Sequence, residues 1–301
     1  MVVLLGLAAA VLYGSGDFLG GMATRRAHVL TVLTLVETAG VIVALAAALA
    51  VTSSGPAGLA GLAWGFSAGL VGGFGLIIFY TGLAAGPMSV VAPVSGLVAA
   101  VLPVGVALAE GERPGAGVYA GALLCLVAIV LASSAGDADR ADRGDRGDHG
   151  DRADGPRPAG RPARLSRAIA YGAASGVSFG LFFLLIRNAG ESGAVWPVAA
   201  GRIGELAIVL AAAAVLRPGL RRGLSGPVPL TAAGAGVIDV VANLCYVAAT
   251  RTGSFGLAVV LASLYPGVTV LWARVVLGER LRWIQRIGLG LAAIGILLVT
   301  A

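Results

Sequence analysis

The chain has 301 residues, of which 58% are hydrophobic and only 12% are charged. A soluble domain carries about 25% charged residues, so this composition excludes an ordinary water-soluble fold. No charged residue occurs between Glu37 and Glu110. That run is long enough for three membrane-spanning helices, since each needs about 20 apolar residues. The net charge of +6 does not indicate nucleic-acid binding, because the arginines stand at the ends of apolar segments and not on one basic face.

The apolar segments, taken in chain order, predict an all-α integral membrane protein with ten transmembrane spans. The spans are roughly residues 2–24, 28–51, 57–83, 88–109, 114–134, 166–187, 194–216, 229–250, 254–277 and 283–300. Most loops are very short, so neighbouring spans are expected to be antiparallel and adjacent. Residues 135–165 are the exception, being rich in Asp, Arg, Gly and Pro. Such a composition cannot bury apolar surface, which predicts a disordered linker that tethers the halves, with a regulatory or binding role as the alternative.

The linker divides the chain into two five-span halves, residues 1–134 and 166–301, and the halves show internal similarity. The sequence Glu110-Gly111-Glu112-Arg113 ends the fourth span, and Leu277-Gly278-Glu279-Arg280 ends the ninth. Tyrosines close the third and eighth spans at nearly the same offset. Because five is an odd number, the second half enters the membrane from the opposite side. This pattern predicts two inverted five-helix repeats, a common plan in secondary transporters.

The distribution of arginine predicts the orientation. With ten spans, sixteen arginines lie in loops on the side of the linker and three lie in loops on the other side. The positive-inside rule therefore favours a multi-pass protein of the plasma (inner) membrane, with the linker in the cytoplasm and both termini outside. The fifth and tenth spans are expected at the periphery as dimer or scaffold helices, so a homodimer is one option.

These sequence features resemble the EamA domain of the drug/metabolite transporter superfamily. The resemblance rests on the two sets of five spans, on Tyr13-Gly14-Ser15 near the start, and on the Gly-Glu-Arg before the last span of each half. The second half matches better, through the run from Leu264 to Leu271 that begins Leu-Tyr-Pro-Gly, whereas the first half has Ala99 where Pro266 predicts proline. Members of the superfamily export or import amino acids, nucleotide sugars, drugs and other metabolites, so the resemblance implies transport without naming a solute.

Ionisable groups inside a span cost about 2.5–3.5 kcal/mol each on insertion scales, and they usually face a cavity or a partner. The candidates are Asp17, Glu37, Arg202, Glu205 and Asp239. Their distance from the start of each span predicts positions in the middle third of the membrane. Since four are acidic and one is basic, one or more carboxylates should be protonated at neutral pH, which a proton-coupled carrier needs.

The sharpest polar stripe is Asp239, Asn243 and Tyr246, which share a helix face at positions i, i+4 and i+7. It predicts either a site for an ammonium, hydroxyls or water, or a hydrogen-bond network between helices. Tyr13 and Asp17 share a face in the same way. Asp17 also stands eight residues before a basic residue, as the coupling carboxylate does in the four-span small multidrug resistance proteins, and that more distant resemblance implies a coupling role.

Arg202 and Glu205 stand at i and i+3, so they can pair along their helix. They are either a mutually neutralised pair or part of a site in which Arg202 holds a carboxylate or phosphate. Glu37 is interpreted as a further member of the site, with a place nearer the interface as the alternative.

We therefore predict a secondary transporter that moves a small metabolite or drug-like solute by alternating access, in proton-coupled export. Its central cavity would be lined by spans 1–4 and 6–9, with Asp239 as the coupling carboxylate. The alternatives are a passive facilitator or channel of the same fold and an integral membrane enzyme. The two histidines, His28 and His149, lie in a loop and in the linker, so neither a catalytic nor a metal constellation is predicted. The expected partners are a small-molecule substrate and the lipid bilayer, without a cofactor.

Overall fold

The computed structural model describes residues 1–51, 58–85, 88–111, 161–189, 195–216, 226–277 and 283–300, with scattered residues between 115 and 131. This part of the chain consists of helices and turns and has no strand. The helices are α1 (Val2–Thr24), α2 (Val29–Val51), α3 (Leu59–Ala85), α4 (Met88–Ala109), α7 (Arg161–Asn188), α8 (Val195–Leu216), α9 (Val228–Thr252), α10 (Phe255–Ala262), α11 (Tyr265–Leu277) and α12 (Trp283–Thr300).

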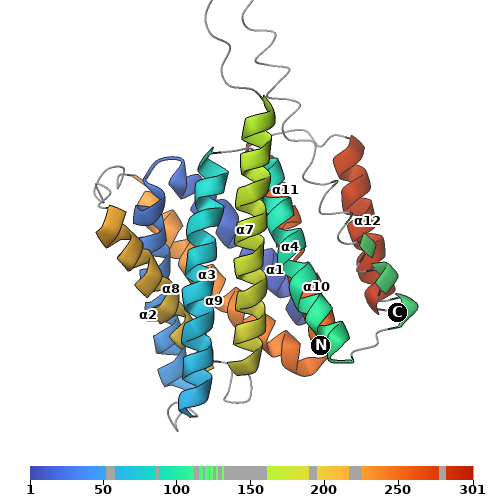
Figure 1. Ribbon diagram of the computed structural model, residues 1–301, viewed down its shortest axis with the longest axis horizontal. Helices are drawn as coiled ribbons and strands as arrows, with labels where there is room; N and C mark the ends of the chain where they lie inside the picture. Colours follow the sequence, from blue (N-terminus) through green and yellow to red (C-terminus); the bar gives the residue numbers. More distant parts are fainter. Residues whose placement is uncertain are drawn as a thin grey trace, which may run out of the picture.

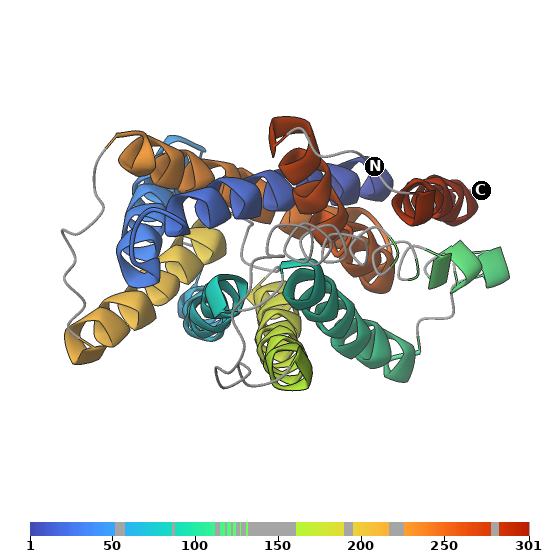
Figure 2. The same cartoon turned by 90° about the horizontal axis from the view of Figure 1, so that it is seen from above.

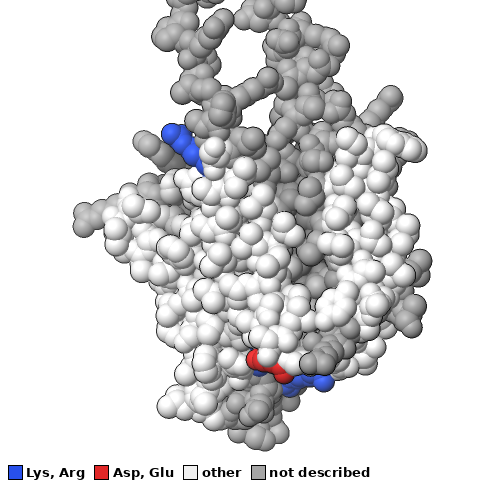
Figure 3. All heavy atoms as spheres, turned by 45° about the vertical axis from the view of Figure 1, so that its right-hand side comes forward, with Lys and Arg blue, Asp and Glu red and all other residues white. Residues whose placement is uncertain are grey.

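The helices have the length and surface of a membrane protein. Within the described residues, six helices are long and apolar enough to cross a bilayer, and two shorter apolar helices cover Val94–Ala109 and Phe255–Thr269. Large apolar side chains such as Leu4 and Leu49 point outward, where they are 72% and 70% exposed. On the face drawn in Figure 3, the charged residues among the described ones lie only toward the two ends of the molecule. The chain is therefore an integral membrane protein.

The first four helices pack mainly against helices of the second half. Helix α1 lies against α9 and against α10 and α11, and α3 lies against α7 and α8. Helix α4 packs on α7, while α2 packs on α8 and α9. Figures 1 and 2 show the resulting interleaved bundle, with α12 at its edge beside the helical fragments from residues 115–131. The bundle interior is thus a junction between the two halves of the sequence.

Glycines bring α3 and α8 into close contact. A Cβ atom added to Gly69 would lie 1.9 Å from the carbonyl oxygen of Gly201, and one added to Gly204 would lie 2.4 Å from the carbonyl oxygen of Phe66. A Cβ on Gly73 would lie 2.3 Å from the Ile208 side chain. Small residues allow backbones in a membrane to approach this closely. These glycines therefore allow α3 to pack closely on α8.

Most predicted spans agree with the helices to within two residues, and two differ. Helix α7 begins at Arg161, five residues inside the predicted linker. The predicted span 254–277 is two helices, α10 and α11, because Pro266 has no N–H to continue the ladder. The turn between them is tighter than an α-helix, since the amide of Leu264 donates to the carbonyl oxygen of Leu261 at 3.2 Å.

Parts of the predicted architecture lie outside the described residues. These are linker residues 135–160 and much of the predicted span 114–134. The plan of ten helices in two inverted repeats therefore stays a prediction.

Candidate functional site

A single buried arginine joins three carboxylates at the centre of the bundle. The Arg202 side chain on α8 is only 1% exposed. Its Nη1 lies 3.0 Å from Oε2 of Glu37 on α2 and 2.9 Å from Oε2 of Glu205 on α8. Its Nη2 donates to Oδ2 of Asp239 on α9. The pair that the i, i+3 spacing predicted is present, but it is one part of a larger network that ties three helices together.

The sequence around Arg202 explains why the network can form. Gly40 on α2 leaves room for the long arginine side chain, because a Cβ there would lie 3.0 Å from Cδ of Arg202. Gly201 and Gly204 flank the arginine on α8 and bring that helix onto α3. A guanidinium has five N–H donors in a fixed plane, so it can satisfy several carboxylates together.

The network continues from Asp239 to the first helix. The Asn243 amide donates to the backbone carbonyl of Asp239 at 3.0 Å and contacts Oδ2 of the same residue at 3.4 Å. The Tyr13 hydroxyl on α1 then donates to Oδ1 of Asn243 at 2.8 Å. Hydrogen bonds therefore run from α1 through α9 to the arginine on α8.

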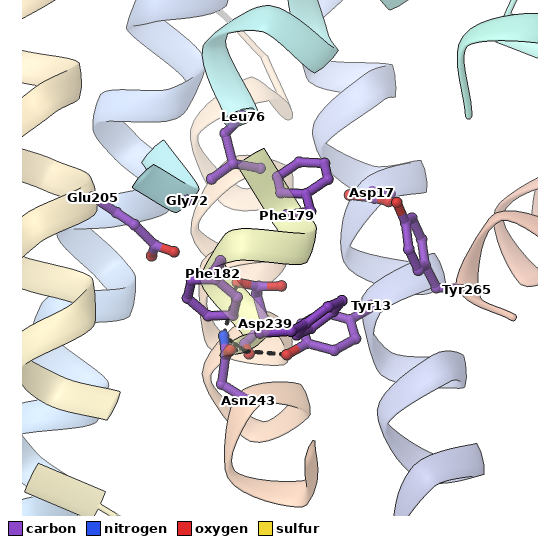
Figure 4. A pocket seen from close by; sticks show the side chains of 11 residues that line it. Tyr13, Asp17, Gly72, Leu76, Phe179, Phe182, Glu205, Asp239, Asn243 and Tyr265 are labelled. Carbon is purple, nitrogen blue, oxygen red and sulfur yellow. Dashed lines mark hydrogen bonds between the residues drawn. The ribbon is translucent and has the colours of Figure 1, made fainter. Parts of the chain in front are cut away.

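A pocket adjoins this network at the junction of the halves. It is lined by residues of α1, α3, α7, α8, α9 and α11: Tyr13, Asp17, Gly72, Leu76, Phe179, Phe182, Phe183, Glu205, Asp239, Asn243 and Tyr265. Figure 4 shows Asp239, Asn243 and Tyr13 on its lower side and Asp17 on its right-hand wall. The side chain of Asp239 is 26% exposed, whereas that of Arg202 is 1% exposed. The pocket therefore borders the carboxylate, and the guanidinium lies behind it.

Asp17 borders the same pocket but is not part of the arginine network. Within the described residues, the structure gives the Asp17 side chain no hydrogen bond or ion pair. Figure 4 shows the carboxylate beside the hydroxyl end of Tyr265. The Tyr265 hydroxyl is itself buried without a hydrogen-bond partner. Two polar groups of the pocket wall are thus available to a ligand.

The remaining residues of the predicted site lie at or near this centre. Glu37 is fully buried and belongs to the network. Tyr246, the third member of the predicted stripe, does not line the pocket. Its ring packs on Phe183 with a centroid distance of 4.6 Å, and its hydroxyl donates to the Phe183 carbonyl at 3.5 Å. The structure therefore brings Asp239 and Asn243 to the pocket and places Tyr246 in the packing between α7 and α9.

Sequence reasoning missed the aromatic wall of the pocket. Phe179, Phe182 and Phe183 come from α7, and Tyr265 comes from the first turn of α11. Aromatic residues in an apolar helix show the same local sequence pattern whether they face lipid, the protein core or a cavity. The available signal was the spacing of three and four residues among the phenylalanines. This spacing places Phe179 on one helix face with Phe182 and Phe183. Within the described residues, no group of three or more His, Cys, Asp or Glu side chains could hold a metal ion.

Comparison with known proteins gives one family and one fold. Residues 166–301 match the model of the EamA-like transporter family. A protein of known crystal structure resembles this chain with a TM-score of 0.70 and 20% sequence identity, over 99% of this chain and 96% of that chain. At that identity the likeness establishes the fold alone. A search of curated protein sequences gives no match.

Proposed function

We propose that the protein is a secondary transporter, because the second half of the chain, residues 166–301, matches the model of the EamA-like transporter family. It moves a small solute across the membrane by alternating access, and it couples that movement to protons. The pocket between the halves is the transport site. Proton coupling and the identity of the solute go beyond the family match and are argued from the site.

The observation that carries the proposal is the surplus of carboxylates around one arginine. Arg202 contacts Glu37, Glu205 and Asp239, and Asp17 lines the adjoining pocket. Four ionised carboxylates with one guanidinium are unfavourable at low dielectric, because burial and like charge both favour protonation. Such a group can hold a proton in one conformation and release it in another. Asp239 is the member that links the network to the pocket, and we assign it the coupling role.

The packing of the helices supports two inverted repeats. In two repeats, α1 to α4 would correspond in order to α7, α8, α9 and the pair α10–α11. Exchanging the halves then turns the contact of α1 with α9 into that of α7 with α3. It turns the contact of α4 with α7 into that of α10–α11 with α1, and it leaves α2 with α8 unchanged. All of these contacts are present. We therefore propose repeats at residues 1–134 and 166–301 that rock against each other around the pocket.

One end of the helix bundle has a candidate gate. Nη1 of Arg187, at the end of α7, lies 2.6 Å from Oε2 of Glu110, just past the end of α4. The guanidinium also lies 4.2 Å from the ring centroid of Phe255, at the start of α10. Figure 3 shows acidic and basic side chains together at the lower end of the molecule. These contacts join α4, α7 and α10 there, and we propose that they break when the pocket opens toward that side.

We place the protein in the plasma membrane with the linker in the cytoplasm, because sixteen loop arginines lie on the linker side and three on the other. An inward proton gradient would then drive the solute outward, so export is the proposed direction. A passive facilitator would use the same pocket without the proton step.

Reconstitution tests this function. Purified protein is screened with metabolites for ligand-induced thermal stabilisation, and a stabilising solute is loaded into proteoliposomes with an imposed pH gradient. The proposal expects saturable movement of the solute against its own gradient, and loss of that movement when an ionophore collapses the pH gradient. Solute that only runs downhill, at a rate independent of the pH gradient, would show a facilitator.

A further inference from the structure

The pocket has an aromatic wall that proton coupling does not require. The ring centroids of Tyr13 and Phe183 are 6.4 Å apart, and those of Phe182 and Phe183 are 5.6 Å apart, both in edge-to-face arrangement. Tyr265 continues this row, with its ring centroid 6.3 Å from that of Tyr13. All four rings line the pocket. A solute in the pocket would therefore lie beside several aromatic rings at once.

The charge that the pocket presents is negative. Asp17, Glu205 and Asp239 belong to its lining, and among the described residues no arginine does. The nearby guanidinium of Arg202 is 1% exposed and already contacts three carboxylates. A carboxylate or phosphate on the solute would have to displace one of them, and it would meet the negative charge of the others.

Two groups of the pocket wall lack a protein partner. Within the described residues, Asp17 has no hydrogen bond or ion pair, although it is close enough to Asp239 for their charges to interact. Tyr265 is only 5% exposed, and no hydrogen bond of normal geometry satisfies its hydroxyl, although the Ser95 side chain is near. In Figure 4 that hydroxyl and the Asp17 carboxylate point toward each other at the edge of the pocket. A buried polar group without a partner is costly, so a bound group that satisfies it is favoured.

We propose that the pocket takes a monovalent organic cation with an aromatic or other apolar group, and that Asp17 is its counter-charge. The rings of Tyr13, Phe183 and Tyr265 would surround the positive centre, because the face of an aromatic ring attracts a cation within about 6 Å. This inference rests on the proposed function, since it takes the pocket to be the transport site. It reverses the interpretation in which Arg202 binds an anionic solute.

Isothermal titration of the purified full-length protein tests the charge preference. The probes are benzyltrimethylammonium and phenylmethanesulfonate, which carry a similar aromatic group and opposite charges. The inference expects saturable binding of the cation and binding of the sulfonate that is at least about tenfold weaker. Asp17→Asn should weaken binding of the cation about tenfold or more. Thr34→Val is the matched control, since that hydroxyl bonds only the Leu30 carbonyl of its own helix, at 2.7 Å, and affinity should not change.

Several outcomes would overturn the inference. One is that the sulfonate binds as tightly as the cation. Another is that the cation does not bind to protein that is monodisperse and melts cooperatively. The third is that Asp17→Asn binds the cation with unchanged affinity. Failure of this inference and failure of the proposed function are distinguishable. Uphill transport of a neutral or anionic solute would contradict the cation site and leave the transporter intact. Tight cation binding without uphill movement of any solute would support the cation site and contradict the proposed transport function.

Discussion

At the scale of single residues, Arg202 decides whether three buried carboxylates can be tolerated. Glu37 and Glu205 are nearly inaccessible, and both lie within ion-pair distance of Arg202. Removing one partner of a buried ion pair is far more damaging than never having had the pair, because it leaves uncompensated charge in a low dielectric. The arginine is therefore structural as well as functional, and substituting it alone cannot report on transport.

Arg202→Gln should lower the free energy of unfolding by about 3–5 kcal/mol, the usual cost of breaking a buried ion pair. The double variant Arg202→Gln/Asp239→Asn should recover part of that loss, because one of the stranded negative charges is removed. Denaturant or thermal unfolding in detergent measures both. Arg167→Gln, at an exposed position on α7, is the control and should have no effect. If Arg202→Gln unfolds like the wild type, the network does not hold the bundle together.

The sequence could identify the charged members of this site because ionisable groups inside apolar spans are rare. It could also predict the pair of Arg202 and Glu205 from their spacing along one helix. It could not predict that Glu37 and Asp239 converge on the same guanidinium, since that depends on how α2, α8 and α9 pack. The place of Tyr246 depended in the same way on Phe183 of another helix.

At the scale of helices, the long apolar segments were predictable because short loops and charges mark their ends. The break between α10 and α11 was less so. A proline such as Pro266 interrupts the hydrogen-bond ladder, but the helix could end before it or bend through it, and α4 runs as a continuous helix through Pro93 and Pro103. The local hydrogen bonds around Leu264 decide the outcome.

The contact between α3 and α8 gives a prediction at this scale. Gly69→Ala should destabilise the protein by about 1–3 kcal/mol, because the new methyl group would overlap the Gly201 carbonyl and overpacking costs that much. Gly234→Ala, in the interior of α9 with no atom within 4 Å of the added Cβ, is the matched control. It should instead stabilise by about 0.5–1 kcal/mol, since alanine favours a helix over glycine. Thermal unfolding of the two variants should thus shift in opposite directions, and equal shifts would contradict the close packing.

The gate formed by Arg187 and Glu110 gives a second prediction. Glu110→Gln should leave stability almost unchanged, because a partly exposed ion pair contributes about 0–1 kcal/mol. It should increase the accessibility of a cysteine introduced in the pocket, such as Leu76→Cys, to a membrane-impermeant thiol reagent. The exchanged pair Glu110→Arg/Arg187→Glu should restore the wild-type labelling rate. The rate should be compared in a Cys125→Ser/Cys245→Ser background, and an unchanged rate in Glu110→Gln would contradict the gating role.

At the scale of the whole molecule, the fold places the candidate site where the two halves meet. Each half alone would expose glycine-lined and charged helix faces, since its main contacts are with the other half. In the sequence, similar segments at the ends of the fourth and ninth spans predict a two-part organisation. It could not show the interleaving, because contacts between distant segments leave no local pattern.

The arginine distribution predicts the orientation of the protein in the membrane. A reporter inserted in the linker at residues 135–160 should report the cytoplasm, and one fused after Ala301 should report the opposite side. A phosphatase and a fluorescent protein, which are active on opposite sides of the membrane, give complementary readings. The reverse pattern would place the gate of Arg187 and Glu110 on the cytoplasmic side and would invert the proposed direction of the cycle.

The central claim is that Asp239 carries the proton that drives the solute. Asp239→Asn preserves the shape of the side chain and removes its carboxylate, and Asp17→Asn is the comparison. The measurement is flux of a stabilising solute in proteoliposomes, with a pH gradient and then as exchange at equal pH. The account predicts that Asp239→Asn loses gradient-driven accumulation and keeps exchange. Accumulation by Asp239→Asn at the wild-type rate would contradict it, and loss of accumulation with retained exchange in Asp17→Asn alone would assign the proton to Asp17.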